Sequence, residues 1–322
     1  MWRDFIPWFG SKRLRNEIAM LNAQLDEESE RHARTEAARR ELEGLWKALW
    51  RPPGHFYSPI TDLAEVEADA QRIFDRRGEI PAIEWNHHTQ IALLDRIMEM
   101  EGDLDFPHTE SPPHRYYSDN DFFPFCDAFF LAGIMRLFES KRIVEVGSGF
   151  SSSVMLDVAD RNSDRDLQLT FIEPYPKRLQ SLLLDEDRER HRILEARVQD
   201  VPFEVFEELR ENDILFIDSS HIVKTGSDVN YLFFEVLPRL AKGVLVHVHD
   251  IPFPFEYGQA EVLEGRSWNE AYLVRAFLQY NSTFEILLYP GGFVWRGHEI
   301  GRQLPKRCED TLGPSLWLRK LA

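Results

Sequence analysis

The chain has 322 residues, of which 43% are hydrophobic, and its 38 basic and 55 acidic residues give a formal net charge of −17. A chain of this length can bury the core of one large domain and carry appendages. The acidic balance argues against duplex nucleic acid as a partner, because a negative surface repels phosphate. The two cysteines, Cys126 and Cys308, lie far apart in sequence. This spacing excludes a disulfide framework and predicts a reducing, cytoplasmic compartment.

Residues 2–15 combine aromatic and aliphatic side chains with a following group of basic residues. The apolar part is too short for a signal peptide, and no stretch of the chain approaches the roughly 18 apolar residues of a membrane span. Two interpretations remain open. The segment either contacts a membrane surface or partner chain, or packs onto the protein's own body.

Residues 11–50 contain no proline and only one glycine, and apolar residues recur at spacings of three and four at both ends of the segment. This spacing predicts a long helix that either pairs as a coiled coil, giving a homo-oligomer, or stays solvated. Between the two ends, the same positions are polar and would weaken a dimer. The apolar positions are Leu14, Ile18, Leu21, Leu25, Leu42, Trp46 and Leu49, and the polar ones are Glu28, His32, Thr35 and Arg39.

The sequence "RPPGHFYSP" ends this helix, because two prolines and a glycine cannot continue it. Helices are predicted at about 62–77 and 87–100. An aromatic stretch at 106–125 is too irregular for regular structure. We interpret residues 51–125 as a lid and substrate region.

From residue 142 on, apolar and often β-branched segments alternate with helical ones, after a predicted helix over 126–140. Such alternation is typical of a doubly wound, Rossmann-like α/β fold with a parallel sheet. The last two strand candidates, 284–290 and 315–320, have no full helix between them, which favours an antiparallel finish. The other strand candidates are 142–146, 167–172, 192–198, 213–217 and 243–248, and the other helices are at about 151–160, 176–186, 203–210, 227–240 and 269–280. The predicted domains are a helical extension (1–50), the lid region (51–125) and a catalytic domain (126–322).

The first strand candidate ends in an unusual way, with Glu145 near its end and then Gly147 and Gly149. In a doubly wound sheet, ligands bind beyond the carboxyl ends of the strands. The two glycines let ligand atoms approach the backbone there, and Glu145 can accept hydrogen bonds from turn amides or from a cationic ligand. The sequence therefore predicts a ligand site at this turn.

Acidic residues also follow the next two strand candidates. Glu173 can accept hydrogen bonds from both hydroxyls of a ribose. Asp200 either receives the exocyclic amine of an adenine or caps a helix. A dinucleotide fingerprint would place glycine at position 152, where this chain has Ser152. One nucleoside without a diphosphate is therefore the predicted ligand.

Asp218 ends the fourth strand candidate, and His221 follows three residues later. The fifth candidate ends "VHVHD", which brings His247, His249 and Asp250 to the same edge if the two strands are neighbours. Such a group suits removal of a proton from a hydroxyl, because histidine titrates near neutral pH. Two aspartates and a histidine also suit Mg²⁺ or Mn²⁺, which accept oxygen-rich ligand sets. His247 is interpreted as a core or supporting histidine.

The motifs "VEVGSGFS", "FIEP", "VQDVP", "DILFIDSSH" and "LAKGVLVHVHDI", in this order and spacing, resemble those of class I S-adenosylmethionine-dependent methyltransferases over about residues 125–320. The resemblance implies a seven-stranded sheet whose last strand is antiparallel. It also implies that S-adenosyl-L-methionine is the cofactor, with Asp218 facing the transferred methyl group. The other implied cofactor contacts are Glu145, Gly147, Ser148, Gly149 and Ser151 for the methionine part, Glu173 for the ribose and the Asp200 region for the adenine.

The chain has Asp218 three residues before His221, and the pair His249–Asp250 follows later. This pattern is similar to that of methyltransferases that act on sugar hydroxyls. The resemblance implies Asp218, His249 and Asp250 as Mg²⁺ ligands and His221 as the catalytic base. His249 stands where those enzymes have a carboxylate. Candidate walls of the substrate site are the aromatic stretch 106–125 and residues 253–272, whose polar and aromatic side chains include Trp268, Asn269, Glu270 and Tyr272.

Three functions are therefore considered. The first is S-adenosylmethionine-dependent methylation of a hydroxyl on a sugar or another small molecule or glycan. The second is a nicotinamide-dependent oxidoreductase on the same sheet, against which Ser152 argues. The third is a non-catalytic coiled-coil assembly protein with a vestigial nucleotide fold.

Overall fold

A computed structural model describes residues 8–75, 79–161, 167–295, 304–308 and 312–322 of the chain. The chain divides into two compact units, residues 1–64 and 65–322, and each is described by itself. The predicted three-part division at residues 50 and 125 remains a proposal about the roles of the parts. In the described part of the chain, no helix has both the length and the apolar character needed to cross a membrane.

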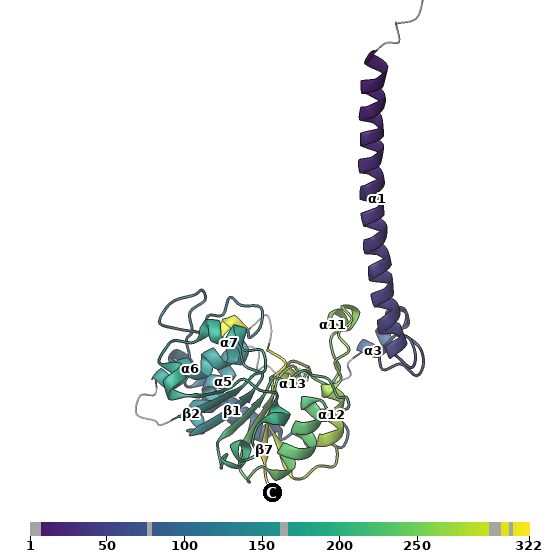
Figure 1. Cartoon of the computed structure of the whole chain (residues 1–322). Coiled ribbons are helices and arrows are strands. Elements are labelled where there is room, and N and C mark those ends of the chain that lie inside the picture. The colour runs from purple at the N-terminus through teal and green to yellow at the C-terminus, as the bar shows by residue number, and fades with distance from the viewer. Residues whose placement is uncertain (1–7, 76–78, 162–166, 296–303, 309–311) are drawn as a thin grey trace, which may run out of the picture. The chain divides into compact units, whose positions relative to one another are not determined.

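The first unit is dominated by one long helix, α1 (Trp8–Ala48) (Figure 1). It forms because the segment is rich in Ala, Leu, Glu and Arg and has no proline until Pro52. Ion pairs within the helix, such as Arg39–Glu43 at 2.9 Å, support it locally. The predicted helix over 11–50 is therefore confirmed.

The second unit is built on a seven-stranded sheet with strand order β3-β2-β1-β4-β5-β7-β6. The first five strands are parallel, and β7 runs antiparallel between β5 and β6. The predicted doubly wound fold with an antiparallel finish is confirmed. The strands are β1 (Arg142–Val146), β2 (Gln168–Ile172), β3 (Arg192–Leu194), β4 (Ile214–Ile217), β5 (Leu245–Val248), β6 (Phe284–Leu288) and β7 (Leu316–Lys320).

The central strands β4 and β5 are buried along their whole length, as expected for a sheet covered on both faces; β4 is entirely apolar, and His247 is the one polar residue of β5. The covering and connecting helices are α2 (Leu63–Ala68), α3 (Ala70–Phe74), α4 (His87–Met98), α5 (Phe125–Leu137), α6 (Phe150–Arg161), α7 (Lys177–Leu182), α8 (Asp187–Arg190), α9 (Glu204–Glu207), α10 (Asp228–Tyr231), α11 (Gln259–Leu263), α12 (Glu270–Leu278) and α13 (Pro290–Trp295). Most of them lie close to the predicted positions, whereas α8, α11 and α13 were not predicted.

Some predicted elements are shorter or broken. The predicted helix at 227–240 begins as α10, continues as one π turn (Leu232–Val236) and ends as a 3₁₀ turn (Leu237–Arg239) around Pro238. Proline lacks the N–H that an α-helix needs at this point, which accounts for the change. The predicted helix at 62–77 is divided into α2 and α3 at Asp69, and residues 76–78 lie outside the described residues.

The aromatic stretch forms no helix or strand over residues 106–124, as predicted, yet it is firmly anchored. Arg115 is buried and forms ion pairs with Asp157 at 3.1 Å, Asp160 at 2.8 Å and Asp187 at 2.5 Å. These carboxylates come from α6 and α8, so the stretch is held against the helix that follows β1. This anchoring positions the end of the stretch beside the candidate site.

Candidate active site

The turn after β1 rests directly on the end of β4. Gly147 has a φ of +83°, and a Cβ added to it would lie 1.7 Å from the backbone oxygen of Asp218. No side chain fits there, and the left-handed backbone also favours glycine. The backbone N–H of Asp218 donates to the oxygen of Val146 at 2.9 Å. Gly147 therefore lets the predicted cofactor loop and the predicted catalytic strand end meet.

Glu145 shapes this turn from below. Its buried carboxylate accepts hydrogen bonds from Ser151 Oγ at 2.6 Å and from Ser152 Oγ, and Ser152 Oγ in turn accepts from the Gly149 N–H at 2.9 Å. Burial raises the pKa of Glu145 to about 7, although the serine hydrogen bonds oppose this shift. The serine at the position of the missing third glycine of a dinucleotide fingerprint therefore ties the loop to Glu145.

A cavity of about 210 Å³ lies above this turn. Its lining includes six of the predicted cofactor residues, whereas Glu145 and Asp200 do not line it. The lining residues are Phe122, Phe123, Gly147, Ser148, Gly149, Phe150, Ser151, Glu173, Arg178, Asp218 and Ser219. The structure therefore gathers most of the predicted cofactor contacts around one cavity.

The carboxylate of Glu173 is fixed by backbone donors. One oxygen accepts from the Ser148 N–H at 3.2 Å and the other from the Tyr175 N–H at 2.7 Å. Asp200 is placed elsewhere, in an exposed ion pair with Arg197 at 2.8 Å, which lowers the pKa of Asp200. Its predicted contact with an adenine stays a prediction.

A second cavity, of about 380 Å³, is larger than the first. It is lined by the residues that begin β1, β2 and β3, including Arg142, Gln168 and Arg192. It therefore lies at the amino ends of the strands, the opposite edge from the one where ligands bind in doubly wound sheets. We do not assign it to the active site.

A nucleoside with a sulfonium side chain suits the residues around the first cavity. The Oγ atoms of Ser148 and Ser219 are buried and have no hydrogen-bond partner among the described residues. Glycine backbone, two free hydroxyls and the Glu173 carboxylate match the polar groups of such a ligand. Asp218 supplies a negative charge for the sulfonium.

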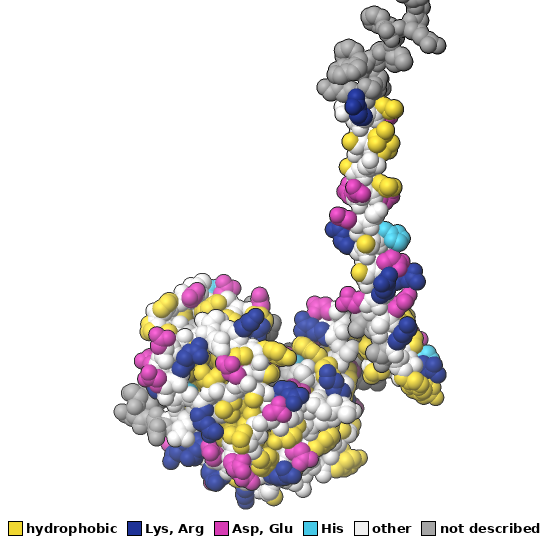
Figure 2. Space-filling view, in the orientation of Figure 1, with side chains coloured by type: hydrophobic (Ala, Val, Ile, Leu, Met, Phe, Trp, Pro, Cys, Tyr) yellow, Lys and Arg dark blue, Asp and Glu magenta, His cyan; other side chains and the backbone are white. Residues whose placement is uncertain are grey.

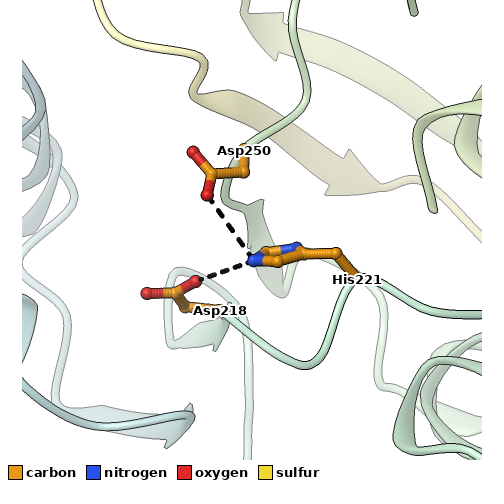
Figure 3. Close-up of side chains that lie close together, drawn as sticks. All are labelled: Asp218, His221 and Asp250. Atoms are coloured by element: carbon orange, nitrogen blue, oxygen red, sulfur yellow. Dashed lines mark ion pairs between the residues drawn. The ribbon is translucent and has the colours of Figure 1, made fainter. Parts of the chain in front are cut away.

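Asp218, His221 and Asp250 converge at the carboxyl ends of β4 and β5, as Figure 3 shows. The Nε2 atom of His221 lies 3.4 Å from Asp218 Oδ1 and 3.5 Å from Asp250 Oδ2. His221 is buried, whereas 30% of each aspartate side chain is exposed. One ligand atom from each of the three residues lies within 4.8 Å of the others, which suits a divalent cation.

This group differs from the predicted metal ligands, because His221 stands in it where His249 was predicted. His249 is buried, with its Nε2 atom 3.7 Å from Asp250 Oδ1 and its Nδ1 atom 3.3 Å from His247 Nε2. The strand ends at Val248, and Asp250 has a φ of +53°, so the alternation of a regular strand does not hold at Asp250. The predicted role of His249 as a ligand stays a prediction.

Behind His221 lies Glu270, whose role the sequence did not indicate. Its Oε2 atom is 2.9 Å from His221 Nδ1, and the residue is fully buried at the start of α12. The N–H groups of Asn269 and Glu270 both donate to the backbone oxygen of His221, at 3.0 and 3.2 Å. The polar and aromatic stretch around Trp268 was the available signal, but it suggested a substrate wall rather than a partner for His221.

Three carboxylates therefore surround one imidazole. Burial alone would lower the pKa of His221, but the hydrogen bonds to Asp218 and Glu270 outweigh it and raise that pKa to about 10. Burial would raise the pKa of Asp218, but His249 and His221 lower it below its usual value. At neutral pH and without ligands, His221 carries a proton and Asp218 a negative charge.

Comparison with known proteins supports a methyltransferase domain. A family model described as "Methyltransferase domain" matches residues 144–251. An uncharacterized protein of Archaeoglobus fulgidus is 35% identical over 171 residues, which is 51% of this chain and 75% of that protein.

Solved structures with a similar arrangement include the SAH-bound methyltransferase PaMTH1 of Podospora anserina, 14% identical with a TM-score of 0.39, matching 80% of this chain and 95% of that one. Another is the O-methyltransferase TomG of Streptomyces achromogenes in complex with SAM. It is 13% identical with a TM-score of 0.36, matching 80% of this chain and 96% of that one. These TM-scores are too low to support a functional inference.

Proposed function

Because the chain belongs to the class I S-adenosylmethionine-dependent methyltransferases, we propose that it transfers the methyl group of that cofactor to a hydroxyl oxygen. The acceptor is a sugar or another small molecule or glycan. The observation that carries the proposal is the position of Asp218, which lines the cavity formed by the predicted cofactor residues and also belongs to the group with His221 and Asp250. A hydroxyl held by that group would face the transferred methyl.

The cofactor contacts follow from the lining of the cavity. Glu173 accepts hydrogen bonds from the ribose hydroxyls, and the bare backbone at Gly147 and Gly149 approaches the methionine part. Asp218 faces the sulfonium, whose positive charge it stabilises. The bound cofactor supplies an electrophilic methyl carbon, so the protein's remaining task is to align the hydroxyl and take its proton.

His221 is the proposed base. Once it has lost the proton that it carries at neutral pH, its Nε2 atom can accept the proton of the hydroxyl. Glu270 keeps the Nδ1–H donor engaged, which fixes the tautomer with Nε2 free. The imidazolium that results is stabilised by Asp218, Asp250 and Glu270.

Mg²⁺ or Mn²⁺ suits the same edge. The carboxylates of Asp218 and Asp250 are the donors that such cations prefer, and the resemblance adds His249. A bound cation would lower the pKa of the substrate hydroxyl and orient it. Such a cation would compete with protonated His221 for the carboxylates of Asp218 and Asp250.

Isothermal titration with S-adenosylhomocysteine tests the cofactor site. We expect saturable binding to the wild type and at least tenfold weaker binding to Glu173→Ala, because this variant loses the ribose acceptor. Glu235→Ala is the matched control, since Glu235 is an exposed carboxylate that lies outside the cavity. Absence of binding heat in the wild type at high protein concentration would overturn the proposal.

Mass spectrometry of candidate glycans, glycolipids and small phenols incubated with the protein and cofactor then identifies the acceptor. Loss of methylated product in Asp218→Ala separates an enzyme from a non-catalytic assembly protein. Residues 144–251 match a methyltransferase family, which argues against the alternative of a nicotinamide-dependent oxidoreductase.

The remaining proposals concern location and partners. We propose a cytoplasmic protein that forms homo-oligomers through residues 11–50. Peripheral membrane contact through residues 2–15 is a further proposal, and residues 1–7 lie outside the described residues. Sedimentation with vesicles, with and without anionic lipid, tests that contact.

A further inference from the structure

The long helix α1 exposes large apolar side chains at the spacing of a coiled-coil seam. Ile18, Leu21 and Leu25 are 50%, 59% and 64% exposed, and Leu42 and Trp46 near the other end are 56% and 57% exposed. Figure 2 shows hydrophobic side chains along the part of the helix toward its N-terminus. Solvated helices of this length rarely leave so many large apolar groups in water, so this seam calls for a partner.

The middle of the seam is polar and decides the orientation of that partner. The same spacing continues through Glu28, His32, Thr35 and Arg39. Parallel pairing of two copies would place each of these residues beside itself. Glu28 would then face Glu28, and Arg39 would face Arg39, and both contacts are repulsive.

An antiparallel arrangement removes both conflicts, and we propose that α1 pairs with α1 of a second copy of this chain as an antiparallel two-stranded coiled coil. A single register opposes Glu28 to Arg39 of the second copy and His32 to Thr35 of the second copy. Within the helix, the same register opposes apolar to apolar residues in the flanking layers, Leu21 to Trp46 and Leu25 to Leu42, and it places Ile18 beside Leu49, which follows the last helical residue Ala48.

This seam is complementary to itself, as a two-fold symmetric interface requires. Each pairing occurs twice, on the two sides of an axis that passes between His32 and Thr35. The polar layers fix the register, since a shift by one heptad would bury charges against apolar side chains. The polar centre, which would weaken a parallel dimer, thus specifies the antiparallel one.

The charged seam residues Glu28 and Arg39 can leave their present partners within the helix. Glu28 contacts Arg31 at 3.2 Å and Arg39 contacts Glu43 at 2.9 Å, and all four side chains are at least half exposed. Exposed pairs within a helix contribute little to stability. Glu28 and Arg39 can therefore change partners when a second helix approaches.

Cysteine crosslinking on the full chain distinguishes the two orientations. In the antiparallel register, Leu21→Cys mixed with Trp46→Cys forms a disulfide-linked pair under mild oxidation, and neither variant alone does. Like positions are then 25 residues apart along the helix axis, about 38 Å. The native Cys126 and Cys308 are both buried, so the wild type is the control for background linking. Linking of either variant with itself would mean parallel pairing and would overturn the proposal.

Exchanging the charges of Glu28 and Arg39 gives an independent test, in which size-exclusion chromatography with light scattering measures the mass of the protein in solution. The wild type should elute at twice the chain mass of 37.8 kDa. Glu28→Arg and Arg39→Glu alone should raise the dimer dissociation constant at least tenfold, and the double exchange should restore it. Glu41→Arg, away from the seam, is the matched control. A wild type at the mass of one chain, or no rescue by the double exchange, would refute the pairing whatever the methyltransferase activity.

Discussion

His221 is held from both sides by carboxylates that come from different parts of the chain. Asp218 and Asp250 face its Nε2 atom, and Glu270 faces its Nδ1 atom. Only the spacing of Asp218 and His221 is local, so the sequence could indicate that pair. Glu270 lies 49 residues after His221, and nothing in the sequence links the two before the chain folds.

Removal of the Glu270 carboxylate should slow turnover without weakening the cofactor. In Glu270→Ala, the Nδ1 atom of His221 loses its partner, and we expect kcat near pH 10, where the wild-type His221 is also largely neutral, to fall about 10- to 100-fold, as is typical for partners that orient a functional histidine. Glu270→Gln keeps an acceptor oxygen and should recover most of the activity. The measurement is kcat and the KM for S-adenosylmethionine.

The exposed Glu264→Gln is a matched control in the preceding segment. A kcat for Glu270→Ala equal to that of the wild type, with a raised KM for the cofactor, would contradict this role and indicate that Glu270 only supports the fold.

The raised pKa of His221 predicts an alkaline rate profile. With a pKa of about 10 in the ligand-free protein, His221 is protonated at pH 7 and cannot accept a proton. Below that pKa, each increase of one pH unit raises the neutral fraction of His221 about tenfold. We therefore expect kcat/KM for the hydroxyl substrate to rise from pH 7 and to level off near pH 10. His221→Ala should lose this rise. A flat wild-type profile between pH 7 and 9 would exclude His221 as the base.

At the scale of the elements, the sequence could predict where most strands and helices occur, but not the residues at which they end. The apolar sequences of β4 and β5 are long enough to identify them as buried parallel strands. The edge strand β3 was expected to reach residue 198 but ends at Leu194, where pairing with β2 stops. The end of β5 mattered most, because it turns Asp250 rather than His249 toward His221.

Residues of the aromatic segment and of α7 line the cavity together. The guanidinium of Arg178 lies 3.6 Å from the centroid of the Phe122 ring, which stacks on Phe150. The cavity of about 210 Å³ is smaller than the roughly 300 Å³ or more usual for ligand sites. We therefore expect the cofactor to enter more readily when this pair moves apart.

Phe122→Ala should speed both entry and release of the cofactor. Removing the ring takes away the partner of Arg178, so we expect the association and dissociation rates of S-adenosylhomocysteine to rise several-fold. The Kd should change by less than about tenfold, since the ribose and methionine contacts remain. Stopped-flow fluorescence measures both rates, and Tyr280→Ala, an exposed aromatic outside the cavity, is the control. Rates equal to those of the wild type would show that the pair does not gate the cavity.

At the scale of the whole molecule, composition and motif order were sufficient to predict the fold and family. The motifs lie at the carboxyl ends of consecutive strands, and that placement follows from the topology of doubly wound sheets. The division of the chain after residue 64 was not predicted. It depends on contacts between residues distant in sequence, which hydrophobic periodicity does not reveal.

The length of α1 has a consequence for the kind of acceptor this enzyme could serve. In the proposed antiparallel pair, the two chains leave the coiled coil at its opposite ends, and Ala48 of one copy lies about 44 Å from Ala48 of the other. The two catalytic domains of such a dimer would bind one long polymer with repeated hydroxyls at two places. The second binding event would then be intramolecular. Avidity of this kind would favour chains over single sugars without any change at the reacting atoms.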